Sequence, residues 1–259
     1  MEPRSNVLGV GISPLDLPRA VEQILAASSR PGFSGYVTVT GVHGIMESQR
    51  DAALKEIHNR SFLSVPDGMP MVWVGKWNGF EDMGRVYGPD LMLGITGTCG
   101  PERGHFYFGG GDGVTAKLAE KLQDRFPCSR VVAQVTPPFR PLTPEEEEQL
   151  AASIRETRPH FFWVGLSTPK QERFMHSFLE KFPDLTAGWD HGLVMLGVGA
   201  AFDFHAGLVK QAPSWLQKRG MEWFFRLLME PKRLWRRYLY NNPRFIWQIF
   251  LQMTELKKF

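Results

Sequence analysis

The sequence predicts an α/β protein, a Rossmann-like parallel sheet with helices on both faces. Short apolar runs with strand character alternate with amphipathic stretches of helical length between about residues 36 and 199. Turns containing Gly, Pro or Asp separate these segments, and no internal repeat interrupts them. Alternation at this spacing is typical of βαβ units, whose strands lie parallel.

Each expected element depends on a local signal. Strands are expected at 7–12, 36–40, around 62–63, 105–108, 130–135, 161–165 and 193–199, where β-branched and aromatic residues gather. Helices are expected at 15–27, 45–59, 71–76, from 89, 114–126, from 144 and 169–182. Pro89 and Pro144 suit a first helical turn, and the acidic run 145–148 suits a helix N-terminus.

The pattern changes near the C-terminus. From Ala212 onward no strand is expected, and the helices should break near Pro231 and Pro243. Net charge is +3 overall, yet residues 210–259 carry eleven Lys and Arg against three Glu, together with four of the eight tryptophans. We therefore divide the chain into a catalytic core, 1–208, and a basic, Trp-rich helical appendage, 209–259.

Composition indicates in which cellular compartment the protein works. Two cysteines without a CxxC spacing disfavour a disulfide framework or a zinc ribbon and fit a reducing compartment. No apolar run is long enough to span a bilayer, and the N-terminus lacks the apolar stretch of a signal peptide. We expect a cytoplasmic protein that can lie on a membrane surface.

The turn V-P-D-G-M-P places a carboxylate, Asp67, directly after the apolar run at Phe62 and Leu63. Pro70 suits the first turn of a helix that begins around Met69. Open α/β folds bind their ligands at such strand ends. Asp67 is therefore a candidate for chemistry, and capping of the following helix is the alternative.

A glycine-rich turn, 109–113, follows the strand at 105–108. Its backbone N–H groups could cradle a diphosphate at a helix N-terminus, and a merely tight turn is the alternative. Dinucleotide binding is disfavoured because the next strand, V-V-A-Q-V-T, ends without an acidic residue. The chain also has no P-loop, no G-x-S-x-G and no D-x-D motif, and the pairs Asp190–His191 and Asp203–His205 make poor metal sites.

Other polar residues follow strands without a decisive local signal. His43 lies between glycines in T-G-V-H-G, Lys170 to Glu172 open a helix, and Asp203 follows a glycine-containing strand end. Each could bind a ligand, and each has a structural alternative.

The appendage favours an anionic partner. Four arginines at 226, 233, 236 and 237 are spaced to lie near one face of consecutive helices, and guanidinium groups match phosphate geometry. The segment 245–253 is amphipathic and basic at its end, which is typical of helices on anionic membranes. Nucleic acid is a weaker candidate for the partner, because the core is acidic and no nucleic-acid-binding motif occurs. Packing of the appendage on the core stays an alternative.

Several motifs occur together in order across about 36–239: P-D-G-M-P, R-V-Y-G-P-D, F-G-G-G-D-G-V, V-G-L-S-T-P-K-Q-E, G-V-G-A-A-F-D-F-H-A-G and a tract from A-P-S-W to R-R-Y-L. This set resembles the WecG/TagA/CpsF family of bacterial glycosyltransferases. The resemblance implies a GT-E type Rossmann-like fold with a C-terminal appendage. It also implies inverting, metal-independent transfer of a sugar, usually from a UDP-sugar, to a polyprenyl-diphosphate-linked glycan.

The resemblance also implies residue roles. Asp67 matches the general base, and Thr40, His43 and Arg85 are assigned to the acceptor or sugar. The nucleotide side takes Gly109, Gly110, Gly111, Lys170, Gln171, Glu172 and Asp203, and the diphosphate takes Arg226, Arg233, Arg236 and Arg237. No metal or cofactor is expected. The partners are the donor, the lipid-linked acceptor and an anionic membrane surface on the inner face of the cell membrane, and a homo-oligomer stays open.

The chain departs from the family pattern at two places. Thr38, Val39 and Thr40 stand where many members have T-x-N, and Gln211 stands where the appendage usually has arginine. T-G-V-H-G with P-D-G-M-P resembles the exopolysaccharide-associated branch. Glucose, N-acetylmannosamine and its uronic acid remain open as donor sugars, and a non-catalytic nucleotide-sugar-binding or scaffold subunit is the alternative function.

Overall fold

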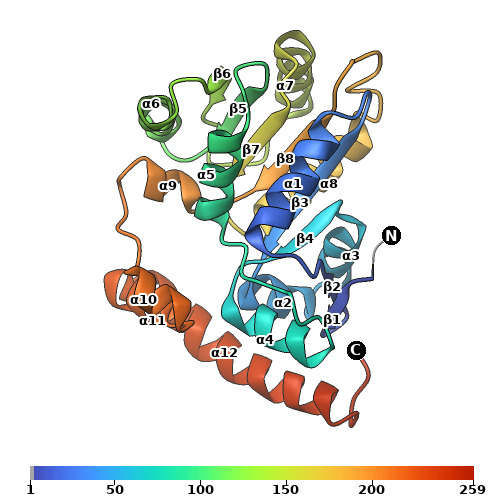
Figure 1. Cartoon of the computed structure of the whole chain (residues 1–259), viewed down its shortest axis with the longest axis vertical. Helices are drawn as coiled ribbons and strands as arrows, with labels where there is room; N and C mark the ends of the chain where they lie inside the picture. Colours follow the sequence, from blue (N-terminus) through green and yellow to red (C-terminus); the bar gives the residue numbers. More distant parts are fainter. Residues whose placement is uncertain (1–2) are drawn as a thin grey trace.

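The computed structural model describes residues 3–259, apart from the side chains of Ser214, Lys218 and Arg233. It confirms the predicted fold class, a Rossmann-like parallel sheet with helices on both faces (Figure 1). Six strands lie in the order β4-β3-β8-β7-β5-β6, all parallel to their neighbours. They are β3 (Ser34–Thr40), β4 (Leu63–Pro66), β5 (Gly104–Gly109), β6 (Arg130–Val135), β7 (Phe161–Gly165) and β8 (Leu193–Gly197).

Two apolar layers cover the sheet. On one face α1 (Leu17–Ser28), α5 (Gly88–Thr98), α6 (Val114–Arg125) and α9 (Ala201–His205) pack on side chains that include Tyr107 and Trp163. On the other face α3 (Ala52–Arg60), α7 (Pro144–Thr157) and α8 (Lys170–Lys181) pack on Phe106 and Phe162. Adjacent residues of one strand thus enter opposite layers, as the two-residue period of a strand requires.

A third apolar cluster lies beyond the carboxyl end of β3 and β4. It joins the hairpin β1 (Ser5–Val7) and β2 (Val10–Ile12) to α2 (Val42–Ser48), α4 (Met69–Trp77) and α12 (Pro231–Met253). Phe245 and Ile249 of α12 are buried in it. Figure 1 shows α12 in red, crossing beneath α2 and α4, with α10 (Ser214–Lys218) and α11 (Glu222–Met229) at its start.

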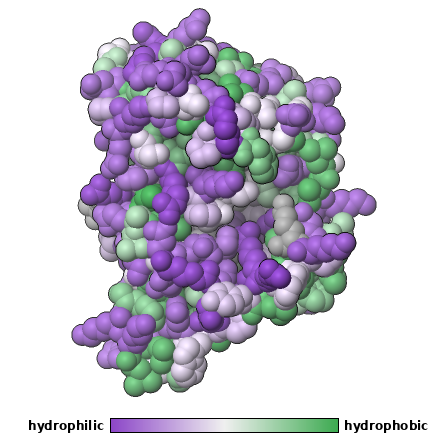
Figure 2. Space-filling model, turned by 180° about the vertical axis from the view of Figure 1, so that it is seen from behind, coloured by the Kyte–Doolittle hydropathy of each residue, from purple (hydrophilic) through white to green (hydrophobic). Residues whose placement is uncertain are grey.

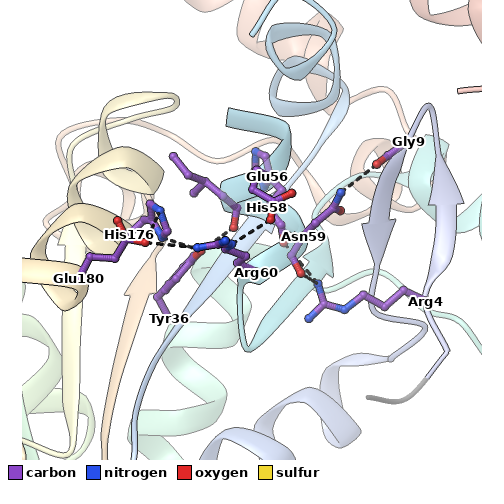
Figure 3. Close-up of polar contacts among 10 residues, drawn as sticks. Arg4, Gly9, Tyr36, Glu56, His58, Asn59, Arg60, His176 and Glu180 are labelled. Carbon is purple, nitrogen blue, oxygen red and sulfur yellow. Dashed lines mark hydrogen bonds and ion pairs between the residues drawn. The ribbon is translucent and has the colours of Figure 1, made fainter. Parts of the chain in front are cut away.

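The N-terminal segment fixes the approach to β4, the strand that leads to Asp67. The Arg4 guanidinium donates to the carbonyl oxygens of His58 and Asn59 at the end of α3, at 3.3 Å each, and to that of Phe62 at 3.0 Å. Asn59 in turn donates to the Gly9 carbonyl at 3.0 Å, so the α3–β4 turn is held from two sides (Figure 3).

Three expected elements are wrong in detail. The single strand expected at 7–12 is a hairpin, because Leu8 and Gly9 adopt φ of 53° and 82° and fold the chain back. The single helix expected at 45–59 is divided into α2 and α3, because the Asp51 carboxylate caps a new helix by accepting from the N–H of Leu54 at 3.1 Å.

The helix break expected near Pro243 is the third error. α12 runs through Pro243 without interruption, whereas the break before Pro231 is present. Proline removes one backbone hydrogen bond, the one to the Leu239 carbonyl. Leu239 is 64% exposed, so water can satisfy that carbonyl, and packing of Phe245 and Ile249 holds the helix in place. In the described part of the chain, no helix is long and apolar enough to cross a membrane.

Candidate functional site

A cleft of about 280 Å³ opens at the carboxyl ends of the parallel strands. The ends of β3, β7 and β8 form its floor, and the starts of α5, α8 and α9 form its sides. Gly165 and Gly197 line it, and both positions require glycine, because a Cβ on Gly165 would lie 2.8 Å from Phe202 and a Cβ on Gly197 would lie 2.7 Å from Met175. This position, outside the carboxyl ends of parallel strands, is where open α/β sheets bind ligands.

A larger groove, of about 860 Å³, adjoins the cleft. α4 forms one side, and α10, α11 and α12 form the other. Asp67, Arg226 and Arg237 line both the cleft and the groove. These three side chains therefore stand at the junction of the two spaces.

Asp67 is positioned by its neighbours in the sheet. Its backbone N–H donates to the Thr40 carbonyl at 3.1 Å, which extends the β3–β4 pairing by one residue. A Cβ on Gly41 would lie 3.3 Å from the Asp67 carboxylate, so a glycine there leaves the carboxylate room. The helix-capping alternative does not hold, because Gly68 is the residue that precedes α4 and the carboxylate interacts with the N–H of Gly88 at the start of α5.

The pKa of Asp67 lies at about 6, well above its ordinary value of 3.8. Burial is the main cause, since a low-dielectric environment disfavours the charged form. The negative charge of Glu222 also raises this pKa, whereas Arg85, Arg226 and the Gly88 N–H lower it. Asp67 is thus largely ionised near pH 7, yet more basic than an ordinary carboxylate.

Arg85 connects the core to the appendage. Its Nε donates to the Asp67 carbonyl at 2.9 Å, its Nη1 donates to Gln217 Oε1 at 3.3 Å, and its Nη2 pairs with Glu222. The guanidinium also lies 4.1 Å from the centre of the Tyr87 ring. Burial together with the Glu222 charge raises the pKa of Tyr87, so its phenol stays protonated.

The structure brings together only some of the predicted phosphate-binding arginines. Arg226 and Arg237 reach the junction, and the buried Nε of Arg226 has no hydrogen-bond partner among the described residues. Arg236 instead lies over the Trp235 ring and lines neither the cleft nor the groove, but a hollow beside α2 that Arg237 also lines. The side chain of Arg233 lies outside the described residues.

Of the predicted nucleotide-side residues, Gly110, Gln171 and Asp203 line the cleft. Gln171 Nε2 donates to the Gly197 carbonyl at 3.0 Å and to Glu172 Oε1 at 3.1 Å. Glu172 itself is fully buried beneath Gln171, its Oε1 also accepts from Thr168 at 2.8 Å, and burial raises its pKa.

Three other nucleotide-side predictions fall outside the cleft lining. Gly109 has φ of 137°, and a Cβ there would lie 2.7 Å from the Gly165 backbone, so its glycine is required by close packing of β5 against β7. Gly111 belongs to the same turn. Lys170 is exposed, with its ammonium 5.5 Å from the Phe139 ring centre.

Thr40 and His43, predicted to face the acceptor or sugar, are held by protein groups. The Thr40 hydroxyl is buried in a network with Thr38, Ser64 and His58 at 2.9–3.2 Å. His43 lines the groove, and burial together with the Arg237 charge lowers its pKa to about 3.

The neutral state of His43 also decides its partners. Nδ1 accepts from the Asn241 amide at 3.2 Å, and the ring interacts with the Thr168 backbone. Glu47, 3.7 Å from the same nitrogen, is therefore no ion-pair partner. His43 links the loop before α8 to α12.

Two residues of the site were not predicted from the sequence: Glu222, which lines the groove, and Tyr87, which lines the cleft. One signal for Glu222 was available, since it is one of only three acidic residues in the basic segment 210–259. Tyr87 stands inside R-V-Y-G-P-D, one of the motifs that carry the family resemblance, but a role was predicted there only for Arg85. Among the described residues, no group of three His, Cys, Asp or Glu side chains is arranged to hold a metal ion.

The chain is a Rossmann-like α/β protein, and an arginine-bearing helical segment overhangs the cleft at the carboxyl ends of its strands. The chain belongs to the glycosyl transferase WecG/TagA/CpsF family, whose model matches residues 5–259. It is a glycosyltransferase.

Two curated relatives carry the same name, N-acetylglucosaminyldiphosphoundecaprenol N-acetyl-beta-D-mannosaminyltransferase. The protein from Bacillus subtilis (strain 168) is 25% identical over 211 residues, 81% of this chain and 77% of the relative. The protein from Bacillus spizizenii is 27% identical over 201 residues, 77% of this chain and 72% of the relative.

The raised pKa of Asp67 predicts a pH-dependent effect on stability. The folded-state pKa of about 6 exceeds the ordinary 3.8, so ionisation of Asp67 lowers the free energy of unfolding as pH rises from about 4 to 6. At pH 8 the free energy of unfolding of Asp67→Asn should therefore exceed that of wild type by about 1–3 kcal/mol. The variant should then unfold at a higher denaturant concentration. The two proteins should be equally stable near pH 3.5.

The matched control is Asp124→Asn, an exposed carboxylate on α6. It should show no such dependence on pH. Equal stability of Asp67→Asn and wild type at both pH values would contradict the assignment of Asp67 to a desolvated site.

Proposed function

We propose that this protein is an inverting, metal-independent glycosyltransferase that moves a sugar from a UDP-sugar to a polyprenyl-diphosphate-linked acceptor. The names of both relatives, which specify a diphosphoundecaprenol acceptor, support the acceptor class. The observation that carries the proposal is the junction, where Asp67, Arg226 and Arg237 face the cleft and the groove at once. A donor in the cleft and an acceptor in the groove meet at one carboxylate.

Asp67 is the general base of the proposed reaction. It takes the proton of the acceptor hydroxyl as that oxygen attacks C1 of the sugar, and the bond from C1 to the departing phosphate oxygen breaks. A base works best when its pKa lies near the operating pH. With a pKa at about 6, Asp67 combines ionisation near pH 7 with useful basicity.

The arginines stabilise the charge that the leaving diphosphate acquires. Arg226 offers a buried Nε that lacks a protein partner among the described residues, and Arg237 lines the same junction. Preorganised donors aimed at developing charge lower the barrier because they need no reorganisation during the reaction. Gln171, Asp203 and the backbone at Gly110 complete the nucleotide side.

The relatives' names also specify a β-linked product. A β linkage formed from an α-linked nucleotide sugar requires inversion at C1, which a single base and one displacement achieve.

The appendage provides the contact with the membrane. Large apolar side chains on α11 and α12 are exposed, among them Leu228, Trp235 and Trp247, amid basic residues. Figure 2 shows a largely hydrophilic face with hydrophobic side chains gathered at its lower end, where Figure 1 places α12. Such a surface suits peripheral binding to an anionic bilayer on the cytoplasmic side, in the synthesis of a surface polysaccharide or exopolysaccharide.

Asp67→Asn tests the role of the base. Transfer to a purified lipid-linked acceptor should fall about a hundredfold or more, because the amide cannot take the hydroxyl proton. The assay measures product with UDP-glucose, UDP-N-acetylmannosamine and its uronic acid, so the same panel identifies the donor. Asp124→Asn should keep full activity, and near wild-type transfer by Asp67→Asn would reject the proposed mechanism.

Arg226→Ala and Arg236→Ala form a pair of matched variants. Arg226→Ala should lower kcat/KM for the donor roughly a hundredfold, because it removes a preorganised donor at the leaving group. Arg236→Ala should have little effect, since Arg236 lines a different hollow. Equal losses in the two variants would mean that the diphosphate is bound elsewhere.

Metal independence is tested by chelation. Transfer by protein treated with EDTA and assayed in EDTA should equal that of the untreated protein, because arginine and backbone donors balance the diphosphate charge. Loss of activity that Mg²⁺ or Mn²⁺ restores would contradict this part of the proposal.

A further inference from the structure

We propose that the groove between α4 and α12 holds the first isoprene units of the acceptor's polyprenyl chain, with Trp73 and Trp77 of α4 as one wall. The inference rests on the proposed function and adds a binding site for the lipid part of the acceptor. It assigns a role to aromatic residues of the body that the catalytic chemistry does not use.

The groove is lined mainly by apolar side chains from two helices. Val74 of α4 and Phe245 and Ile249 of α12 belong to the buried cluster at its floor. Trp77 on one rim is 70% exposed, and Ile246 on the other is 68% exposed. Large apolar surfaces left in water in this way mark sites that a ligand covers.

The polar character of the lining changes along α12. Arg237 lies at the junction, and beyond it the lining residues of α12 are aromatic, aliphatic, amide or proline side chains only, ending at Met253. A ligand that fits this arrangement has an anionic head at the arginines and a hydrocarbon tail that needs no hydrogen bonds. The diphosphate and polyprenyl parts of the acceptor have this order.

The groove is continuous with the junction, and this favours the polyprenyl chain over other occupants. Arg219 lines the groove but not the cleft, so the acceptor's diphosphate can bind there while Arg226 and Arg237 hold the diphosphate of the donor, and the acceptor's hydrocarbon then lies at the mouth of the groove. From Arg237 to Met253 the helix rises about 24 Å at 1.5 Å per residue. That length accepts several isoprene units, and the rest of a long chain stays in the bilayer.

The test compares two acceptors with the same N-acetylglucosamine diphosphate head, one carrying a long polyprenyl chain and one a short alkyl group. Both are assayed with the full-length protein in detergent, without a bilayer. Trp77→Ala and Ile246→Ala should raise KM for the long-chain acceptor roughly tenfold and leave KM for the short-chain acceptor unchanged. Because both side chains are exposed, turnover of the short-chain acceptor also reports that each variant is folded.

The matched controls are Trp215→Ala and Leu256→Ala, which remove exposed side chains of the appendage that do not line the groove. Both should behave as wild type with either acceptor in detergent. Equal KM changes for the two acceptors, or equal effects of control and groove variants, would overturn the inference. So would an effect of the groove variants that appears only with vesicles, or a change in sedimentation that shows a second copy on this face.

The outcomes also separate this inference from the proposed function. Transfer to both acceptors without any groove effect rejects the lipid site and keeps the transferase proposal. Failure of the wild-type protein to glycosylate either acceptor with any UDP-sugar rejects both.

Discussion

The ion pair between Arg85 and Glu222 is the constraint on which the site depends. Both side chains are mostly buried, at 17% and 13% exposure, and they connect the body to the first turn of α11. Removing one partner would leave an uncompensated charge in a desolvated space, which costs far more than loss of a surface pair. Arg85 also donates to the Asp67 carbonyl, so a single guanidinium holds both the strand end that carries Asp67 and the first turn of α11. Arg85 and Glu222 also line the groove.

The same pair sets the electrostatic balance at Asp67. Glu222 raises the pKa of Asp67, and Arg85 and Arg226 lower it, while burial has the largest effect. An anionic diphosphate bound at Arg226 would offset that arginine's positive charge. The pKa of Asp67 would then rise further, so in the proposed reaction donor binding would make Asp67 a stronger base. Glu222 thus has an electrostatic role as well as a structural one.

Much of the fold could be predicted because it follows from local periodicity. The alternation of apolar strands and amphipathic helices fixed a parallel sheet, and parallel strands gather their carboxyl ends, which placed Asp67, Gln171 and Asp203 on one edge. Packing over long range could not be predicted. Pro243 indicates a break locally, but burial of Phe245 and Ile249 keeps α12 continuous. Spacing along the chain also could not show that Arg226 and Arg237 reach the junction while Arg236 does not, since α11 and α12 meet at a turn.

The third apolar cluster explains how different parts of the fold could bind the two proposed substrates. Residues of the first strands, of α4 and of α12 pack together in it, so the appendage is anchored well beyond the residues that touch the junction. Strand ends, which a parallel sheet holds rigidly, form the cleft that we propose for the donor, and the sides of helices form the groove that we propose for the acceptor. Exchange of side chains on α4 or α12 would alter the groove without moving a strand. Asp67, at the end of β4 and beside the start of α4, lines both the cleft and the groove, which is why we propose that the transfer reaction takes place there.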